Sequence, residues 1–206
     1  TPPITVSSAV EGMVNVRGLE SIFLPGSSIT VSVVVVLLSA IFIFQRFGTK
    51  VVGTAFGPIM GLWFTMLLAL GLVMVLRYPD VLRALSPHYA IRLLTEYPQG
   101  FWLLGGVFLC TTGAEALYSD LGHVGRKNIQ ASWGLVKAAL VINYMGQGAW
   151  ALHESTGVLN GKNPFYALMP EWFVIPGVVI STCATVIASQ AVITGSFTLI
   201  SEAISM

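Results

Sequence analysis

Apolar runs long enough to cross a bilayer are the feature that most constrains this chain. The clearest run extends over residues 29–47 and carries one ionisable side chain, Arg46, near its end. A hydrocarbon core of about 30 Å is crossed by roughly 20 helical residues. Lipid offers no partner to backbone N–H and C=O groups, so a continuous apolar run of this length predicts a transmembrane helix.

The composition of the whole chain agrees with membrane burial. Hydrophobic residues make up 55% of the chain and charged residues 9%, whereas soluble domains carry about 25% charged residues. The formal net charge is +1 and there is no basic stripe, which excludes nucleic acid as a partner. Cys110 and Cys183 lie in apolar runs, where cysteine acts as a small hydrophobe, so no disulfide is expected.

We therefore predict an all-α transmembrane domain that occupies residues 1–206. The expected membrane segments are a partial one at 4–16 and complete ones at 29–47, 54–76, 101–120, 131–152 and 173–200. Residues 78–99 mix charged side chains with leucines, which is typical of helices that lie at the membrane surface.

The two ends of the chain lack the features of a complete membrane protein. The sequence begins at Thr1 without an initiator Met or a basic leader region, and it stops at Met206 without a polar tail. A secretory signal would carry positive charge before its apolar core. We expect an internal part of a larger protein, whose missing N- and C-terminal parts are partners of this domain.

An acidic residue inside a predicted membrane segment marks the first candidate site. Insertion of an ionised Glu115 at mid-membrane costs ~2.5–3.5 kcal/mol, so intramembrane acids usually serve a function. Thr112, Glu115 and Tyr118 are spaced by three residues and Ser119 follows Glu115 by four, which puts them on one helix face. Gly113 weakens the helix there and frees carbonyl groups. Such a set of oxygen atoms replaces the hydration shell of an alkali cation. The alternative is a plain hydrogen bond from Glu115 to a neighbouring helix.

Glu11 is the second candidate, because it stands beside Ser7 and Gly12 in another apolar stretch. The alternative for Glu11 is a position near the membrane surface. Asp120 is a secondary candidate that pairs with His123 or simply ends a solvated helix. Two ligands without a third do not make a zinc site, so no metal is expected beyond a transported ion.

Four amide and hydroxyl side chains in the later apolar segments are expected to hydrogen-bond between helices. They are Asn143, Gln147, Ser189 and Gln190.

The longest recognisable motif lies around Glu115. Residues 113–125 read Gly-Ala-Glu-Ala-Leu-Tyr-Ser-Asp-Leu-Gly-His-Val-Gly, and this stretch resembles the signature of the Kup (KUP/HAK/KT) potassium uptake transporters. Further blocks resemble the family in the same order, at residues 1–12, 56–64, 143–149, 163–166 and 184–193.

The resemblance implies a fold and a set of site residues. Members of the family are understood to have twelve membrane helices, with a LeuT-like core of two inverted five-helix repeats like that of amino acid/polyamine/organocation transporters. In such cores the first and sixth helices are broken around the site. On that template this chain runs from the third helix into the eighth. The third helix carries Glu11, and the sixth carries Thr112 and Glu115, as potassium- or proton-coupling positions.

The resemblance implies a secondary transporter of the bacterial inner membrane that imports potassium by proton symport. A carboxylate withdrawn from water takes up a proton more readily, which suits an acid that couples the two ions. The expected partners are potassium, protons and membrane lipid, with a homodimer as one open oligomeric state, and no cofactor is expected. Two alternatives stay open: transport of another small substrate such as an amino acid, and a truncated membrane scaffold that transports nothing. An enzyme is not expected, for want of a paired nucleophile and base.

Overall fold

A computed structural model describes residues 2–16, 22–24, 26–45, 53–109, 126–154 and 163–205. These residues form helices and connecting turns without any strand, which confirms the prediction of an all-α chain. In chain order the elements are α1 (Pro2–Glu11), η1 (Gly12–Asn15), α2 (Ser28–Gln45), α3 (Gly53–Arg77), η2 (Pro79–Leu85), α4 (Pro87–Glu96), α5 (Gly100–Leu109), α7 (Arg126–His153), α8 (Pro164–Ala167), η3 (Glu171–Phe173) and α9 (Val174–Ser205).

Two of the described helical stretches are long and apolar enough to cross a membrane, Phe56–Arg77 in α3 and Glu171–Phe197 in η3 and α9. Shorter apolar helices cover Ser28–Ile43 and Gly100–Leu109. The segment between α3 and α5 forms η2 and α4, and α4 has no buried residue. The ionisable side chains of η2 and α4 are exposed to the surroundings rather than packed inside the molecule.

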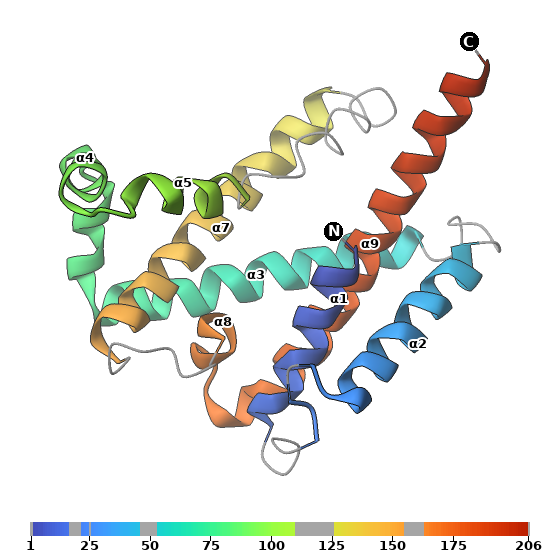
Figure 1. Cartoon of the computed structure of the whole chain (residues 1–206), viewed down its shortest axis with the longest axis horizontal. Helices are drawn as coiled ribbons and strands as arrows, with labels where there is room; N and C mark the ends of the chain where they lie inside the picture. Colours follow the sequence, from blue (N-terminus) through green and yellow to red (C-terminus); the bar gives the residue numbers. More distant parts are fainter. Residues whose placement is uncertain are drawn as a thin grey trace.

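The helices form two packed groups that α3 joins (Figure 1). In the first group α1 packs against both α2 and α9, and α9 runs along α1 in the opposite direction. In the second group α3 crosses α7, while α4 and α5 lie on the far side of that crossing from α2. Because α3 also contacts α9, it connects the two groups.

The crossing of α3 and α7 depends on two glycines. A Cβ atom built on Gly71 would lie 2.6 Å from the Cα of Asn143, and one on Gly146 would lie 2.6 Å from the Cα of Gly71. Small residues allow membrane helices to approach until their backbones touch. The close approach lets Asn143 Nδ2 donate a 3.1 Å hydrogen bond to the Leu67 carbonyl, which confirms its predicted interhelical role. Gln147 donates to Asn143 Oδ1 at 2.6 Å, within its own helix rather than between helices.

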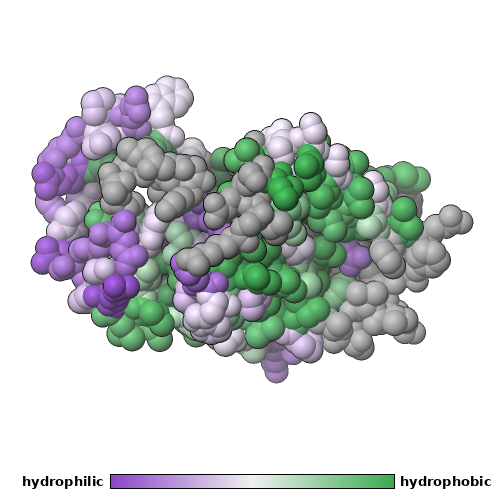
Figure 2. Space-filling view, turned by 90° about the horizontal axis from the view of Figure 1, so that it is seen from below, coloured by the Kyte–Doolittle hydropathy of each residue, from purple (hydrophilic) through white to green (hydrophobic). Residues whose placement is uncertain are grey.

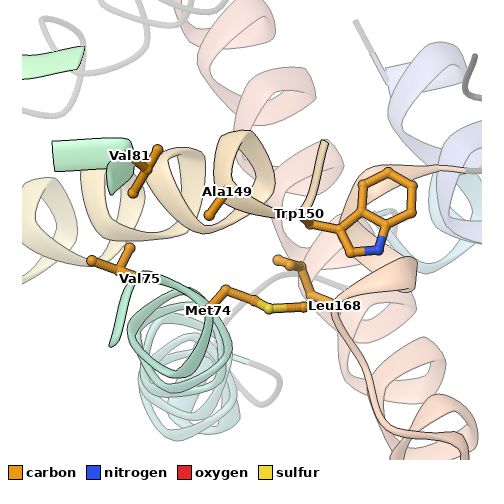
Figure 3. Close-up of a cluster of buried hydrophobic side chains, with 6 residues drawn as sticks. All are labelled: Met74, Val75, Val81, Ala149, Trp150 and Leu168. Carbon is orange, nitrogen blue, oxygen red and sulfur yellow. The ribbon is translucent and has the colours of Figure 1, made fainter. Parts of the chain in front are cut away.

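An apolar cluster lies beside this crossing, where α3, η2, α7 and the end of α8 meet (Figure 3). Its buried members are Met74, Val75, Val81, Ala149, Trp150 and Leu168. Just outside the cluster, Glu154 forms an ion pair with Arg77 at 3.1 Å and accepts a hydrogen bond from the Tyr78 hydroxyl at 3.2 Å. Exposed pairs of this kind add little stability, so the buried cluster and the glycine contact carry the packing.

The molecular surface is divided by polarity. Figure 2 shows hydrophilic residues gathered at the end of the molecule that carries α4, and mainly hydrophobic residues over the rest of the coloured surface. Large apolar side chains such as Val36, Phe42 and Leu76 are exposed. An apolar surface of this extent suits contact with lipid or with further protein rather than with water.

Candidate functional site

The predicted site residues divide into those the structure describes and those it does not. Thr112, Glu115, Tyr118, Ser119 and Asp120 lie outside the described residues. Glu11 is described, and the site is therefore built from Glu11 and the groups around it.

Glu11 is the last residue of α1, at the point where the helix tightens. Its backbone is still helical, with φ −61° and ψ −24°, and the 3₁₀ helix η1 begins at Gly12. The side chain is half-buried, and its Oε1 accepts a 3.1 Å hydrogen bond from the Ser7 hydroxyl one turn earlier. The carboxylate and its hydroxyl partner thus place two oxygen groups side by side at the end of a helix.

The helix that carries Glu11 is held by a buried apolar face. Val6, Ala9 and Val10 are buried, at the i, i+3, i+4 spacing that places them on one side of a helix. Val6 and Val10 pack with Ile41 of α2 and Ile193 of α9. Glu11 and Ser7 are only partly covered, so the polar side of α1 is the more accessible one.

A buried tyrosine from α8 packs against the end of α1, next to Glu11 in the sequence. Tyr166 is 3% exposed, and its ring occupies the space that a Cβ atom on Gly12 would need. Its hydroxyl lies 3.4 Å from the Ala9 carbonyl and 3.0 Å from Ser181 Oγ of α9. Tyr166 therefore joins α1 to α9 directly beside Glu11.

The local sequence explains how Tyr166 reaches this position. Asn163 caps α8, its Oδ1 accepting a 3.0 Å hydrogen bond from the Phe165 N–H, and Pro164 occupies the first helical position. Both residue types favour a helix start. The single turn that follows directs Tyr166 inward.

The hydrogen bonds at this junction show which hydroxyl donates to which acceptor. The Ser181 hydroxyl lies 2.9 Å from the Val178 carbonyl, to which it donates within α9. Tyr166 then supplies the proton shared between Ser181 Oγ and the Ala9 carbonyl. Burial raises the pKa of the Tyr166 hydroxyl, the Ser181 hydrogen bond lowers it, and the nearby Glu11 charge raises it again. The hydroxyl is therefore a neutral hydrogen-bonding group at physiological pH.

Sequence reasoning did not identify Tyr166 or Ser181 as site residues. Tyr166 belongs to the block 163–166 that carries the family resemblance, which is the one signal that singles it out. A four-residue helix is too short to show a periodic pattern, and Ser181 is one hydroxyl in a long apolar helix. Their importance follows only from the contact between segments more than 150 residues apart in sequence.

Two further polar groups on α9 lie buried without a hydrogen-bond partner among the described residues. They are Ser189 Oγ and Gln190 Oε1. Both residues were expected to bond between helices, and no such bond forms at these two atoms within the described part of the chain. Cys183, also on α9, is a free thiol.

Comparison with known proteins identifies the family. A family model described as "K+ potassium transporter integral membrane domain" matches residues 1–206. Among curated relatives, a protein of Cytophaga hutchinsonii is 54% identical over the whole chain and 31% of its own length. Relatives from Flavobacterium johnsoniae and Clostridium perfringens are each 50% identical over the whole chain, and the chain covers 31% and 32% of their lengths. All three are named "Probable potassium transport system protein Kup".

The chain spans about a third of the length of these relatives, 31% in the first case. No solved structure matches it. The family description and the bacterial relatives confirm the predictions of a multi-pass membrane protein of the bacterial inner membrane and of a transporter family rather than an enzyme. Because the family model matches every residue and the sequence is 50–54% identical to these relatives, the chain belongs to the Kup (KUP/HAK/KT) family of potassium transporters.

Proposed function

We propose that the chain is part of a longer secondary transporter that imports potassium together with protons across the bacterial inner membrane. The match of all 206 residues to relatives named as potassium transport proteins carries the choice of ion. The carboxylate of Glu11, hydrogen-bonded to Ser7 at the end of a packed apolar helix, supports a role for this residue in coupling.

The proposed site brings together oxygen groups from two regions of the sequence. Glu11 contributes a carboxylate and Ser7 a hydroxyl at the end of α1. Thr112, Glu115 and Tyr118, with Ser119 and Asp120 close to them in the sequence, are proposed to complete the site. An all-oxygen lining is the coordination that a hard monovalent cation accepts in place of water.

The proposed mechanism uses an acid that binds a proton in one state and faces potassium in another. Entry of positive charge is assisted by an inward membrane potential, by ~2.3 kcal/mol per charge for each 100 mV. Tyr166 and Ser181 are proposed as positioning residues. The Tyr166 hydroxyl, which also bonds to Ser181, lies near the Ala9 carbonyl, and the Tyr166 ring packs on Gly12, so the backbone is held on either side of Glu11. We also propose the LeuT-like arrangement of inverted repeats for the longer protein.

The test uses the complete reading frame that contains these residues, expressed in a bacterial strain without potassium uptake systems of its own. We expect growth at limiting potassium and uptake of rubidium, a potassium substitute. Glu115→Gln is expected to abolish both while the amount of protein in the membrane stays normal. In proteoliposomes, an inward proton gradient applied at zero membrane potential is expected to drive rubidium uptake.

The alternatives give different results in the same strain. A transporter of amino acids would show amino acid uptake without rescue at limiting potassium, and a membrane scaffold would show neither activity. Normal rescue by Glu115→Gln would remove that residue from the mechanism, and rubidium uptake indifferent to the proton gradient would refute proton coupling.

A further inference from the structure

A groove between α2, α3 and α9 is not used by the proposed ion site. It encloses about 430 Å³. Its walls are formed mainly by apolar side chains, among them Leu37 and Ile41 of α2, Phe56 and Ile59 of α3, and Val186 of α9. We call it the α2–α3–α9 groove. Walls of this kind offer a cation few oxygen ligands in place of its hydration shell, so they suit an apolar occupant better than an ion.

One polar group in the groove lacks a partner. Gln190 lines the groove and is 6% exposed, and its Oε1 atom has no hydrogen-bond partner among the described residues. Thr182, another polar residue of the lining, is different because its hydroxyl donates to the Val178 carbonyl of its own helix at 2.8 Å. The groove therefore presents an apolar surface with one unused acceptor.

These properties define what the groove would bind. An occupant must offer an apolar surface along its length and one hydrogen-bond donor opposite Gln190. A lipid acyl chain meets the first requirement and not the second, and it would leave a buried carbonyl oxygen unpaired, which is unfavourable in hydrocarbon. A membrane helix with one serine, threonine, asparagine or glutamine meets both, since such side chains hydrogen-bond across helix interfaces.

The curated relatives supply a source for that helix. The chain covers 31% of the length of the first relative, so most of such a transporter lies outside these residues. We infer that the α2–α3–α9 groove is the seat of a membrane helix encoded outside residues 1–206 of the same polypeptide, with a donor side chain that bonds to Gln190 Oε1. This inference rests on the proposed function only in taking the chain as part of a longer transporter.

Photocrosslinking in the full-length protein tests the inference directly. The photoreactive residue p-benzoylphenylalanine replaces Phe56, which lines the groove. The matched control replaces Phe42, which lies on α2 outside the groove lining and is 54% exposed. After irradiation in native membranes, position 56 is expected to give an adduct within the same polypeptide, with a peptide outside residues 1–206. Position 42 is expected to give lipid adducts or none.

The same photoreactive residue is also placed at Leu37, a second residue of the groove lining, so that the test does not depend on expression of the Phe56 variant. A lipid adduct at the groove, a crosslinked dimer, an adduct with a peptide inside residues 1–206, or no adduct at either position would each overturn the inference. None of these readouts measures ion transport. A negative crosslinking result would therefore refute the inference about the groove and leave the proposed function untouched.

The role of Gln190 is tested by the sign of a stability change. Gln190→Met keeps nearly the same shape and removes the acceptor. If a donor bonds to Oε1 in the full-length protein, the thermal midpoint of the detergent-solubilised variant falls, because the donor is left unpaired. If no donor is present, removal of an unpaired polar atom leaves the midpoint unchanged or raises it, and that result would refute the proposed bond.

Discussion

The backbone of Gly146 on α7 lies against that of Gly71 on α3, so closely that a Cβ on Gly146 would lie 2.6 Å from the Gly71 Cα and 2.9 Å from its carbonyl oxygen. Neither backbone can shift without moving a whole helix. This contact brings Asn143 within hydrogen-bonding distance of the Leu67 carbonyl. It therefore fixes the geometry of the group of helices that α3 connects to α1 and α9.

Alanine at either glycine of this contact is expected to destabilise the protein. Gly71→Ala and Gly146→Ala force a methyl group into backbone atoms, and overpacking of this kind costs about 1–3 kcal/mol. The measurement is the thermal midpoint of the full-length protein in detergent. Gly61→Ala is the matched control on α3, where no atom lies within 4 Å of the added Cβ. It is expected to be neutral or to stabilise by up to ~1 kcal/mol, because alanine favours helix. Equal losses for all three would show that the contact is not specific.

Asn143→Leu is expected to lower stability through lost hydrogen bonds. Asn143 is buried, donates to the Leu67 carbonyl and accepts from Gln147. Interhelical hydrogen bonds in membrane proteins contribute about 0.6 kcal/mol on average, and the orphaned Gln147 amide adds to the loss. Thermal midpoints of the solubilised protein measure the effect. Gln130→Leu, at an exposed amide of the same helix, should change the midpoint little, and an equal fall there would argue against a specific role for Asn143.

Glu11→Gln is expected to reduce rubidium uptake at least tenfold without unfolding the protein. Glutamine keeps an oxygen that accepts the Ser7 hydrogen bond, while it loses the negative charge and the ability to bind a proton. Uptake is measured over a range of external pH, and any residual uptake is expected to lose its pH dependence. Glu96→Gln is the control, because Glu96 is exposed and pairs with Arg92 one turn earlier on its own helix. Wild-type uptake by Glu11→Gln would exclude Glu11 from coupling.

Tyr166→Phe is expected to loosen the junction beside Glu11. Phenylalanine keeps the ring against Gly12 and removes the hydroxyl that lies near the Ala9 carbonyl and Ser181 Oγ. Loss of a buried hydrogen-bonding group of this kind costs about 1–3 kcal/mol, so the thermal midpoint should fall.

A positioning role for Tyr166 adds a kinetic expectation. The KM for rubidium is expected to rise more than the maximal rate falls, because the end of α1 is less firmly held. Tyr97→Phe, at an exposed tyrosine, is the control. A lower midpoint with unchanged KM would show that Tyr166 stabilises the fold without positioning Glu11.

Much of the fold was predictable because its signals are local. The run over residues 29–47 needs no tertiary information to be recognised as a helix, and α2 forms over Ser28–Gln45. The expected segment at 131–152 corresponds to α7, which starts earlier, at Arg126. Helix ends depend on caps and contacts, and the polar first turn of α7 gives no apolar signal.

The candidate site was predictable only in part. Glu11 stood out because an acid in an apolar stretch is unusual in any context, whereas Tyr166 and Ser181 look ordinary in the sequence. The expected roles of Thr112, Glu115, Tyr118, Ser119 and Asp120 stay predictions, since these residues lie outside the described part of the chain.

By itself the sequence determined that this chain enters a membrane, that it does so as helices, and that it belongs to a family of potassium transporters. These properties follow from apolar runs and contiguous motifs, which are read along the chain. Only the tertiary structure decided that Gly71 meets Gly146, that Tyr166 packs on Gly12 beside Glu11, and that Gln190 faces an apolar groove. The reason is physical: helices with apolar surfaces on most sides pack in many ways, and the observed packing is selected by small residues and buried polar groups that meet across large separations in sequence.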